Sequence, residues 1–195
     1  MLINQHTAGR PEAVRVETLT GRYGIDPEHS SVRFSVRHAV LSRMRGTFTD
    51  VGGLLLLAGT WSDRSLMYVD VRTESLCTGA AWRDARIKGP SLFDSVTFPL
   101  LSLRSVRIAP AADGCLQLDG RLLLKDLELP LRVVMALNGI ERDARGARRL
   151  RLLGNAALRR SDWGLGWNTP WWTAGALFGD RVDLAFELSA VRSDD

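Results

Sequence analysis

The sequence predicts an all-β domain, either a barrel or a sandwich, and three observations lead to this prediction. Apolar and polar residues alternate with a period of two over most of the chain from Tyr23 onward, which is typical of strands with one buried face. Turn-forming residues separate the alternating runs, and no strand–helix–strand rhythm of the kind that builds parallel sheets is present. At 195 residues, the chain is long enough to bury the core of one domain without disulfides or metals.

Five runs show the alternation most clearly. Their apolar members are Val32, Phe34 and Val36; Met67, Val69 and Val71; Leu127, Leu129, Leu131, Val133, Met135 and Leu137; Leu150, Leu152, Ala156 and Leu158; and Val182, Leu184, Phe186 and Leu188. Two further strand-like stretches, 102–109 and 115–124, are separated by Asp113-Gly114. Turns are also predicted at Gly52-Gly53, at Gly79 and at Asn138-Gly139, which closes the longest run.

Two segments depart from the alternation. Residues 82–96, WRDARIKGPSLFDSV, are predicted to form a short helix, or a helix and a loop broken at Gly89-Pro90, that plugs one mouth of a barrel. Residues 1–20 are predicted to be a polar leader, and their order is left open. The folded domain is therefore predicted to span residues 21–192.

The basic charge does not indicate a nucleic-acid-binding protein. The net charge is +4 and the pI about 9.7, but lysine occurs only at positions 88 and 125, and the arginines are spread along the chain among acidic residues. We therefore expect a solvated surface with no nucleic acid as partner. A weak attraction to anionic membrane surfaces stays open.

The sequence favours a cytoplasmic location. The N-terminal residues contain no apolar run long enough for the core of a signal peptide, and no stretch approaches the roughly 18 apolar residues of a spanning helix. Cys77 and Cys115 are interpreted as small buried hydrophobes, with a bridge between them left as the alternative for an exported protein.

Ten short segments, in order and at familiar spacing, resemble the YceI-like family, also called polyisoprenoid-binding proteins. They cover roughly residues 23 to 190 and read Tyr23–Ser30, Ser35–His38, Arg45–Phe48, Glu74–Gly79, Arg83-Asp84, Ser91–Asp94, Phe98-Pro99, Asp119–Leu122, Arg160–Gly164 and Gly179–Val182. The resemblance implies an eight-stranded antiparallel lipocalin-like barrel with its helical segment near 82–96. It also implies a long isoprenoid or similar amphiphilic chain in the barrel interior, which suits the width of such a barrel.

This resemblance turns the apolar strand faces into candidate ligand contacts. They are Phe34, Val36, Val69, Val71, Leu131, Val133, Met135 and Phe186. The same faces would equally build a solid core, so the side chains alone do not indicate a cavity. Ligand specificity is then expected to depend on tunnel length and on polar residues at the mouth.

Three polar residues are candidates for contact with a ligand head group: His38, Arg83 and Asp84. For His38, the favoured interpretation is a buried hydrogen-bonding residue that ties the strand end to the helical segment or to a loop. For Arg83 and Asp84, it is pairing or capping at the start of the helix. Arg160 and Asp162 are expected to form an ion pair near a turn, and Trp171-Trp172 either gates a mouth, meets a membrane or packs under a loop.

The sequence gives little support for catalysis. Its histidines are His6, His29 and His38, with no metal-binding pair among them, no nucleophile elbow and no phosphate-binding glycine loop. We therefore predict a carrier for a hydrophobic small molecule with no metal and no cofactor. Two alternatives stay open: an enzyme or redox partner acting on the lipid's head group through His38, Arg83 and Asp84, and a filled barrel working through its surface, for example as a homodimer.

Overall fold

The computed structural model describes residues 19–38, 42–58, 64–112, 115–142, 146–166 and 178–193. These residues form strands with one α-helix and short 3-10 turns. In chain order the elements are β1 (Gly21–Ile25), η2 (Pro27–His29), β2 (Ser31–His38), β3 (Ser42–Phe48), β4 (Val51–Leu57), β5 (Leu66–Arg72), η3 (Thr73–Ser75), β6 (Leu76–Cys77), α1 (Ala81–Lys88), β7 (Leu100–Pro110), β8 (Cys115–Leu124), β9 (Leu127–Arg142), β10 (Arg148–Arg159), η5 (Arg160–Trp163) and β11 (Phe178–Arg192).

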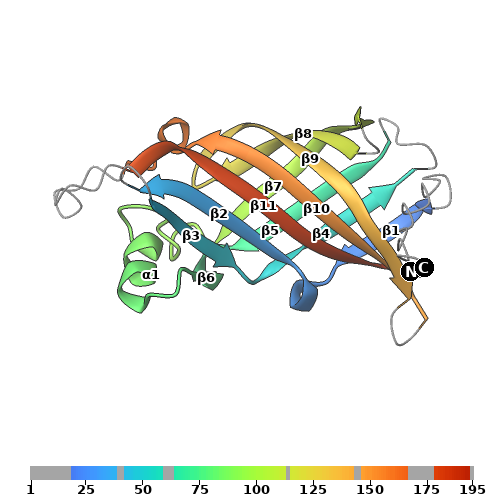
Figure 1. The fold of residues 1–195 in the computed structure, drawn as a ribbon, viewed down its shortest axis with the longest axis horizontal. Coiled ribbons are helices and arrows are strands. Elements are labelled where there is room, and N and C mark those ends of the chain that lie inside the picture. The colour runs from blue at the N-terminus through green and yellow to red at the C-terminus, as the bar shows by residue number, and fades with distance from the viewer. Residues whose placement is uncertain are drawn as a thin grey trace, which may run out of the picture.

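The strands close into one antiparallel barrel. Among the described residues, eleven strand segments form a single sheet, which closes because β1 pairs with both β4 and β11. β1 and β2 run in the same direction along β11 and are separated only by η2. In the same way, β5 continues into β6 after η3, and β3 continues into β4 after two residues. Counting each broken pair as one strand gives the eight strands of the predicted lipocalin-like barrel, which is confirmed (Figure 1).

Two of the predicted turns are wrong, because their glycines lie inside strands. Gly52-Gly53 belongs to β4, where a Cβ on Gly53 would lie 2.0 Å from the carbonyl oxygen of Tyr68. Asn138-Gly139 belongs to β9, where Asn138 is the extra residue of a bulge in the pairing with β10. Both glycines are thus used for close approach or curvature of strands and not to reverse the chain.

The helical segment closes one end of the barrel, as predicted. Gly79, with φ of 82°, bends the chain after β6 into α1, and the helix ends at Gly89. The residues after Gly89 fold back on the helix, since the amides of Phe93 and Ser95 donate to the carbonyls of Ile87 and Lys88. Figure 1 shows α1 beside β3 and β6, at the end of the barrel opposite β1.

The barrel interior divides along its length into two halves. The half nearer β1, called here the filled half, holds buried side chains: Leu19, Tyr23, Leu55, Met67, Leu118, Met135, Leu150 and Leu152. The phenol of Tyr23 donates to the carbonyl of Leu19 at 3.0 Å. The other half, nearer α1, contains the large cavity described below and is called the open half. Leu19 is only 1% exposed, so a residue two positions before the predicted domain boundary already packs in the barrel.

Charged side chains on the outer face of the barrel pair across strands. Ion pairs join Arg33 to Glu187, Arg43 to Asp183, Arg121 to Glu128, Arg132 to Asp119 and Arg151 to Glu141. Exposed pairs of this kind stabilise a protein by only about 0–1 kcal/mol each. Their role is to interleave the two signs of charge over the surface.

Several sequence-based predictions fall outside the described residues or need correction. The leader up to residue 18, the turn at Asp113-Gly114 and the Trp171-Trp172 pair lie outside the described residues. Both cysteines are free; Cys77 is exposed and Cys115 is half-buried, so their predicted burial is wrong. Within the described part of the chain, no helix combines the length and the apolar character needed to cross a bilayer.

Candidate functional site

An apolar cavity occupies the open half of the barrel. The centre of a water-sized sphere can move through about 90 Å³ of it. Eighteen residues line it, and every one except Arg160 is apolar: Val32, Phe34, Val36, Phe48, Val69, Val71, Leu92, Phe93, Leu101, Leu103, Leu122, Leu124, Leu158, Arg160, Leu165, Val182, Leu184 and Phe186. Such a surface has no polar group with which to hold water, so it favours an apolar occupant.

Short side chains in the wall contribute to the free space, and a separate segment covers one end of the cavity. Val36, Val69 and Val182 are among five valines in the lining, and a valine reaches less far toward the barrel axis than a leucine or a methionine. At the α1 end, Leu92 and Phe93 come from the segment after the helix. This segment therefore acts as a lid over the open half.

Aromatic side chains connect the lid to the wall. The ring of Phe93 meets that of Phe48 edge-on, with centroids 5.8 Å apart, and Phe48 lies 5.9 Å from Phe34. The Phe34 ring packs over Gly46, where a Cβ would approach it to 2.5 Å. Gly46 thus leaves the space in which this ring lies, which gives a physical reason for a glycine between Arg45 and Thr47.

Arg160 is the charged residue of the lining, and its guanidinium is bonded to the backbone. It donates to the carbonyl oxygens of Leu165 at 2.7 Å, Gly179 at 3.1 Å and Phe178 at 3.4 Å. The predicted ion pair with Asp162 is therefore wrong, since the guanidinium ties η5 to the start of β11 instead. The polar surface that reaches the cavity is minimal, so Arg160 contributes mainly carbon to the lining.

The predicted apolar contacts fall into two groups. Phe34, Val36, Val69, Val71 and Phe186 line the cavity. The other three, Leu131, Val133 and Met135, are buried in β9 away from this cavity, and Met135 lines a separate small void in the filled half. Contact of all eight with a ligand stays a prediction, but the structure brings only the first group together around one space.

His38 lies at the α1 end of the barrel, where β2 ends. Its Nδ1 is 3.1 Å from Ser42 Oγ, and the Ser42 hydroxyl donates to the His38 carbonyl. The imidazole also packs on Phe178, with ring centroids 4.5 Å apart. These contacts join the ends of β2, β3 and β11. The sequence favoured a buried residue tied to the helical segment or a loop, whereas His38 is half-buried and its partners lie in neighbouring strands. His38 is not among the residues that line the cavity.

Arg83 and Asp84 both bind Thr78 at the start of α1. The Arg83 guanidinium donates to the Thr78 hydroxyl at 2.8 Å and to its carbonyl at 2.9 Å. The Asp84 carboxylate accepts hydrogen bonds from the amide and the hydroxyl of Thr78. The two charges therefore hold the chain between β6 and α1, and neither residue lines the cavity.

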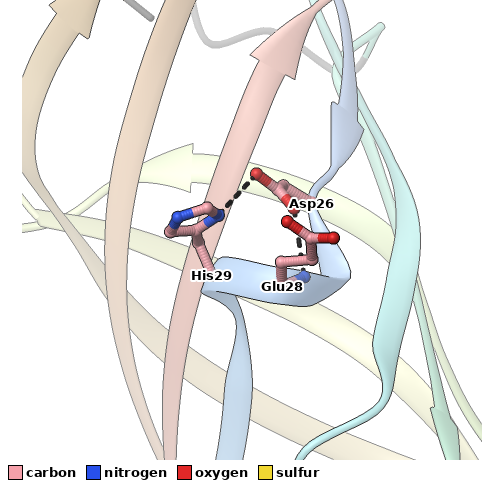
Figure 2. Close-up of side chains that lie close together, drawn as sticks. All are labelled: Asp26, Glu28 and His29. Carbon is pink, nitrogen blue, oxygen red and sulfur yellow. Dashed lines mark hydrogen bonds and ion pairs between the residues drawn. The ribbon is translucent and has the colours of Figure 1, made fainter.

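The Asp26, Glu28 and His29 side chains gather at η2, on the turn that joins β1 to β2 (Figure 2). Asp26 accepts from the amide of Glu28, lies 2.9 Å from His29 Nδ1 and pairs with Arg149. Burial raises the Asp26 pKa, but the hydrogen bonds from Arg149, His29 and Glu28 together hold that pKa below its usual value. A carboxylate already engaged by an arginine and a backbone amide caps the turn, and this occupation disfavours a cation.

Comparison with known proteins identifies the family to which this barrel belongs. The model of the YceI-like domain matches residues 23–190. The protein belongs to the YceI-like family. Relatives include a UPF0312 protein of Pseudomonas savastanoi pv. phaseolicola, 27% identical over 173 residues that make up 88% of each chain. Another, from Pseudomonas fluorescens, is 30% identical over 155 residues, 76% of this chain and 78% of the relative.

Solved structures share the YceI-like fold. The barrel resembles BcnA of Burkholderia cenocepacia, with a TM-score of 0.69 and 19% identity over 85% of this chain and 98% of the other. It also resembles a polyisoprenoid-binding domain from Saccharophagus degradans that is implicated in plant cell wall breakdown. That match has a TM-score of 0.65 and 16% identity over 88% of this chain and 98% of the other. At these identities the likeness shows the fold.

Sequence reasoning missed part of the YceI-like cavity, notably the lid and two wall strands. Leu92 and Phe93 lie in a segment without alternation, so no periodicity marks them as inward-facing. Leu103 and Leu122 lie in strands that the sequence did predict, at 102–109 and 115–124. Extending the inward register to these strands would have found both residues, because they pair directly with each other across β7 and β8.

Proposed function

We propose that this YceI-like protein binds and carries a long-chain isoprenoid or related amphiphilic lipid, such as a polyprenol or an isoprenoid quinone, in the open half of its barrel. The observation that supports this proposal is the cavity itself, whose lining is apolar at every residue except Arg160. The chain of such a lipid is flexible and slender, which suits a narrow space between opposite strands of an eight-stranded barrel.

Binding in this cavity would be driven by removal of the chain from water. Each buried methylene contributes roughly 0.8 kcal/mol, so affinity accumulates along the chain without any specific polar contact. Because the cavity offers almost no polar surface, a head group would stay at its α1 end or outside. We therefore expect selection by the shape and length of the chain rather than by the head group.

The proposed role is non-catalytic. An enzyme acting on the head group would need a reactive side chain beside the cavity. The three polar candidates bind neighbouring elements instead: His38 contacts Ser42 and Phe178, while Arg83 and Asp84 bind Thr78. Their geometry suits the positioning of the lid and the strand ends.

Native mass spectrometry of freshly purified protein, followed by solvent extraction, tests the proposal. The expected result is one lipid of a single chemical class per barrel, or uptake of one equivalent when polyprenols, isoprenoid quinones and fatty acids are offered. Protein that is purified empty and takes up none of these would refute it and favour a barrel that works through its surface.

We also propose that the lipid is exchanged at a membrane surface through the α1 end. Two apolar side chains stand exposed there, Trp82 on α1 at 66% and Val96 on the lid at 95%. Flotation with lipid vesicles should show binding that weakens in a Trp82→Ala, Val96→Ser double variant, whereas equal flotation would contradict this route.

A cytoplasmic location and a homodimer stay predictions, to be checked by cell fractionation and analytical ultracentrifugation.

A further inference from the structure

Three residues form a row across the barrel wall at the boundary between the two halves. Phe186 of β11 pairs in register with Gly154 of β10, and Gly154 pairs with Met135 of β9. All three are buried on the inward face. The row therefore runs from one long side chain to another through a residue that has none.

The missing side chain of Gly154 lets its two neighbours close the row. A Cβ on Gly154 would lie 3.1 Å from Met135 Cε and 3.2 Å from Phe186 Cβ. Met135 thus extends over the glycine toward Phe186, and the space above Gly154 is occupied from both sides. Methionine suits this position because its unbranched, flexible chain adapts to an irregular gap.

The two ends of the row face different spaces. Phe186 lines the large cavity of the open half, whereas Met135 lines a void of about 10 Å³ in the filled half. That void has room for about one water-sized sphere and is lined by Leu55, Met67, Ile108, Leu116, Leu118, Met135 and Leu152. The Met135 side chain therefore borders this void and lies over Gly154, next to Phe186, which lines the cavity.

We propose that Met135, held over Gly154 against Phe186, forms the floor of the cavity and sets the maximum length of chain that the protein binds. This inference rests on the proposed function and adds a residue that determines its specificity. A chain that enters from the α1 end meets this floor, and further carbons must then remain outside in water. Affinity should rise with chain length and then level off.

The test measures the affinity of straight-chain primary alcohols of increasing length for wild-type protein and for Met135→Ala. Below the limit, each added methylene should raise affinity by about fourfold, the equivalent of roughly 0.8 kcal/mol. Met135→Ala removes the atoms that cover Gly154 and joins the cavity to the void, so the plateau should move to longer chains. Alcohols just beyond the wild-type limit should gain on the order of tenfold in affinity.

Met67→Ala is the matched control. It removes the same atoms from a buried methionine that lines the same void, but Met67 is not part of the row at Gly154. Its plateau should stay at the wild-type length. If Met135→Ala does not fold, Met135→Val keeps a strand-forming side chain while removing the part that reaches Gly154.

The outcomes separate this inference from the proposed function. Wild-type protein that binds none of the alcohols, and no isoprenoid either, would refute the proposed function. Wild-type protein with a plateau that neither Met135→Ala nor Met135→Val shifts would refute the role of Met135 while leaving the binding function intact. An equal shift in Met67→Ala would also refute it, because the effect would then follow from any loss of volume in the filled half.

Discussion

The open and filled halves of the barrel share the same strands and the same alternation, yet one contains a cavity and the other a solid core. Around the filled half, Tyr23, Leu118 and Met135 are fully buried, and a void of about 10 Å³ lies beside Leu118 and Met135. Around the open half, valines such as Val36 and Val69 leave the axis free, and a separate lid covers the end. Both halves carry the same apolar pattern, so this pattern alone does not reveal which half of a barrel is hollow.

The largest expected difference between the halves is the stability cost of the same truncation. Leu118→Ala in the filled half should lower the free energy of unfolding by about 4 kcal/mol, because a cavity replaces a packed side chain. Leu103→Ala should cost about half as much, since Leu103 already borders free space and has fewer contacts to lose. Urea denaturation of both variants measures the difference, and equal losses would contradict the division into two halves.

A polar substitution should separate the halves by function. Val69→Asn places an amide in the cavity, where a bound chain would leave it without hydrogen-bond partners. Affinity for the chain should fall by about 10- to 100-fold, the equivalent of roughly 1–3 kcal/mol. Val69 borders the cavity, which leaves room for a water beside the new amide, whereas Val133 borders neither the cavity nor the small void. The melting temperature should therefore change less in Val69→Asn than in Val133→Asn. Isothermal titration and thermal melts test both, and undiminished affinity in Val69→Asn would argue against binding in the open half.

Filling the open half from its wall should weaken both binding and stability. Gly46→Val forces the Phe34 ring to move, because even a Cβ would lie 2.5 Å from it. We expect a loss of about 1–3 kcal/mol in unfolding free energy from overpacking, together with reduced uptake of lipid. Gly139→Ala is the control, because nothing lies within 4 Å of a Cβ there. If Gly46→Val has the same unfolding free energy and lipid uptake as Gly139→Ala, the Phe34 ring must be able to move into other free space.

Most of the fold was predictable because alternation reports which side of a strand faces inward. The runs at Val32, Val69, Val133 and Phe186 all became inward-facing strand residues. Closure into a barrel came from the family resemblance, since two packed sheets show the same period. The two wrong turns, at Gly52-Gly53 and Asn138-Gly139, show a limit of local rules, because a glycine inside a curved strand has the same sequence signature as one in a hairpin.

The site was less predictable than the fold because it depends on sizes summed across the barrel. Leu131 and Val133 have the same inward orientation as Val69 and Phe186, and only the opposing strands make one set core and the other lining. The lid residue Phe93 lies outside any periodic run. The sequence of a single strand cannot predict where a cavity lies. Its position depends on the diameter of the barrel, the register of its strands and the lid that covers its end.

The smallest expected change in stability is at the Asp26–Arg149 ion pair beside η2, and it should depend on pH. Asp26 lies between β1 of the filled half and β2 of the open half, and it pairs with Arg149, both side chains being mostly buried. Its pKa is lower in the folded protein than the ordinary value of 3.8. The stabilisation is therefore fully present above about pH 3.8 and is lost as the pH falls through the lower, folded pKa. Asp26→Asn keeps a residue that caps η2 well but removes the charge, so it should cost about 1–2 kcal/mol at neutral pH. The difference in unfolding free energy between Asp26→Asn and wild type should narrow in acid, as followed by urea denaturation over a pH series.

Asp183→Asn serves as the comparison. The pKa of Asp183 is also lowered, by Arg181 and Arg43, but its side chain is 38% exposed, so loss of this carboxylate should lower stability less. A gap between Asp26→Asn and wild type that stays constant through the acid range would show that the charge of Asp26 is not the source of the stabilisation.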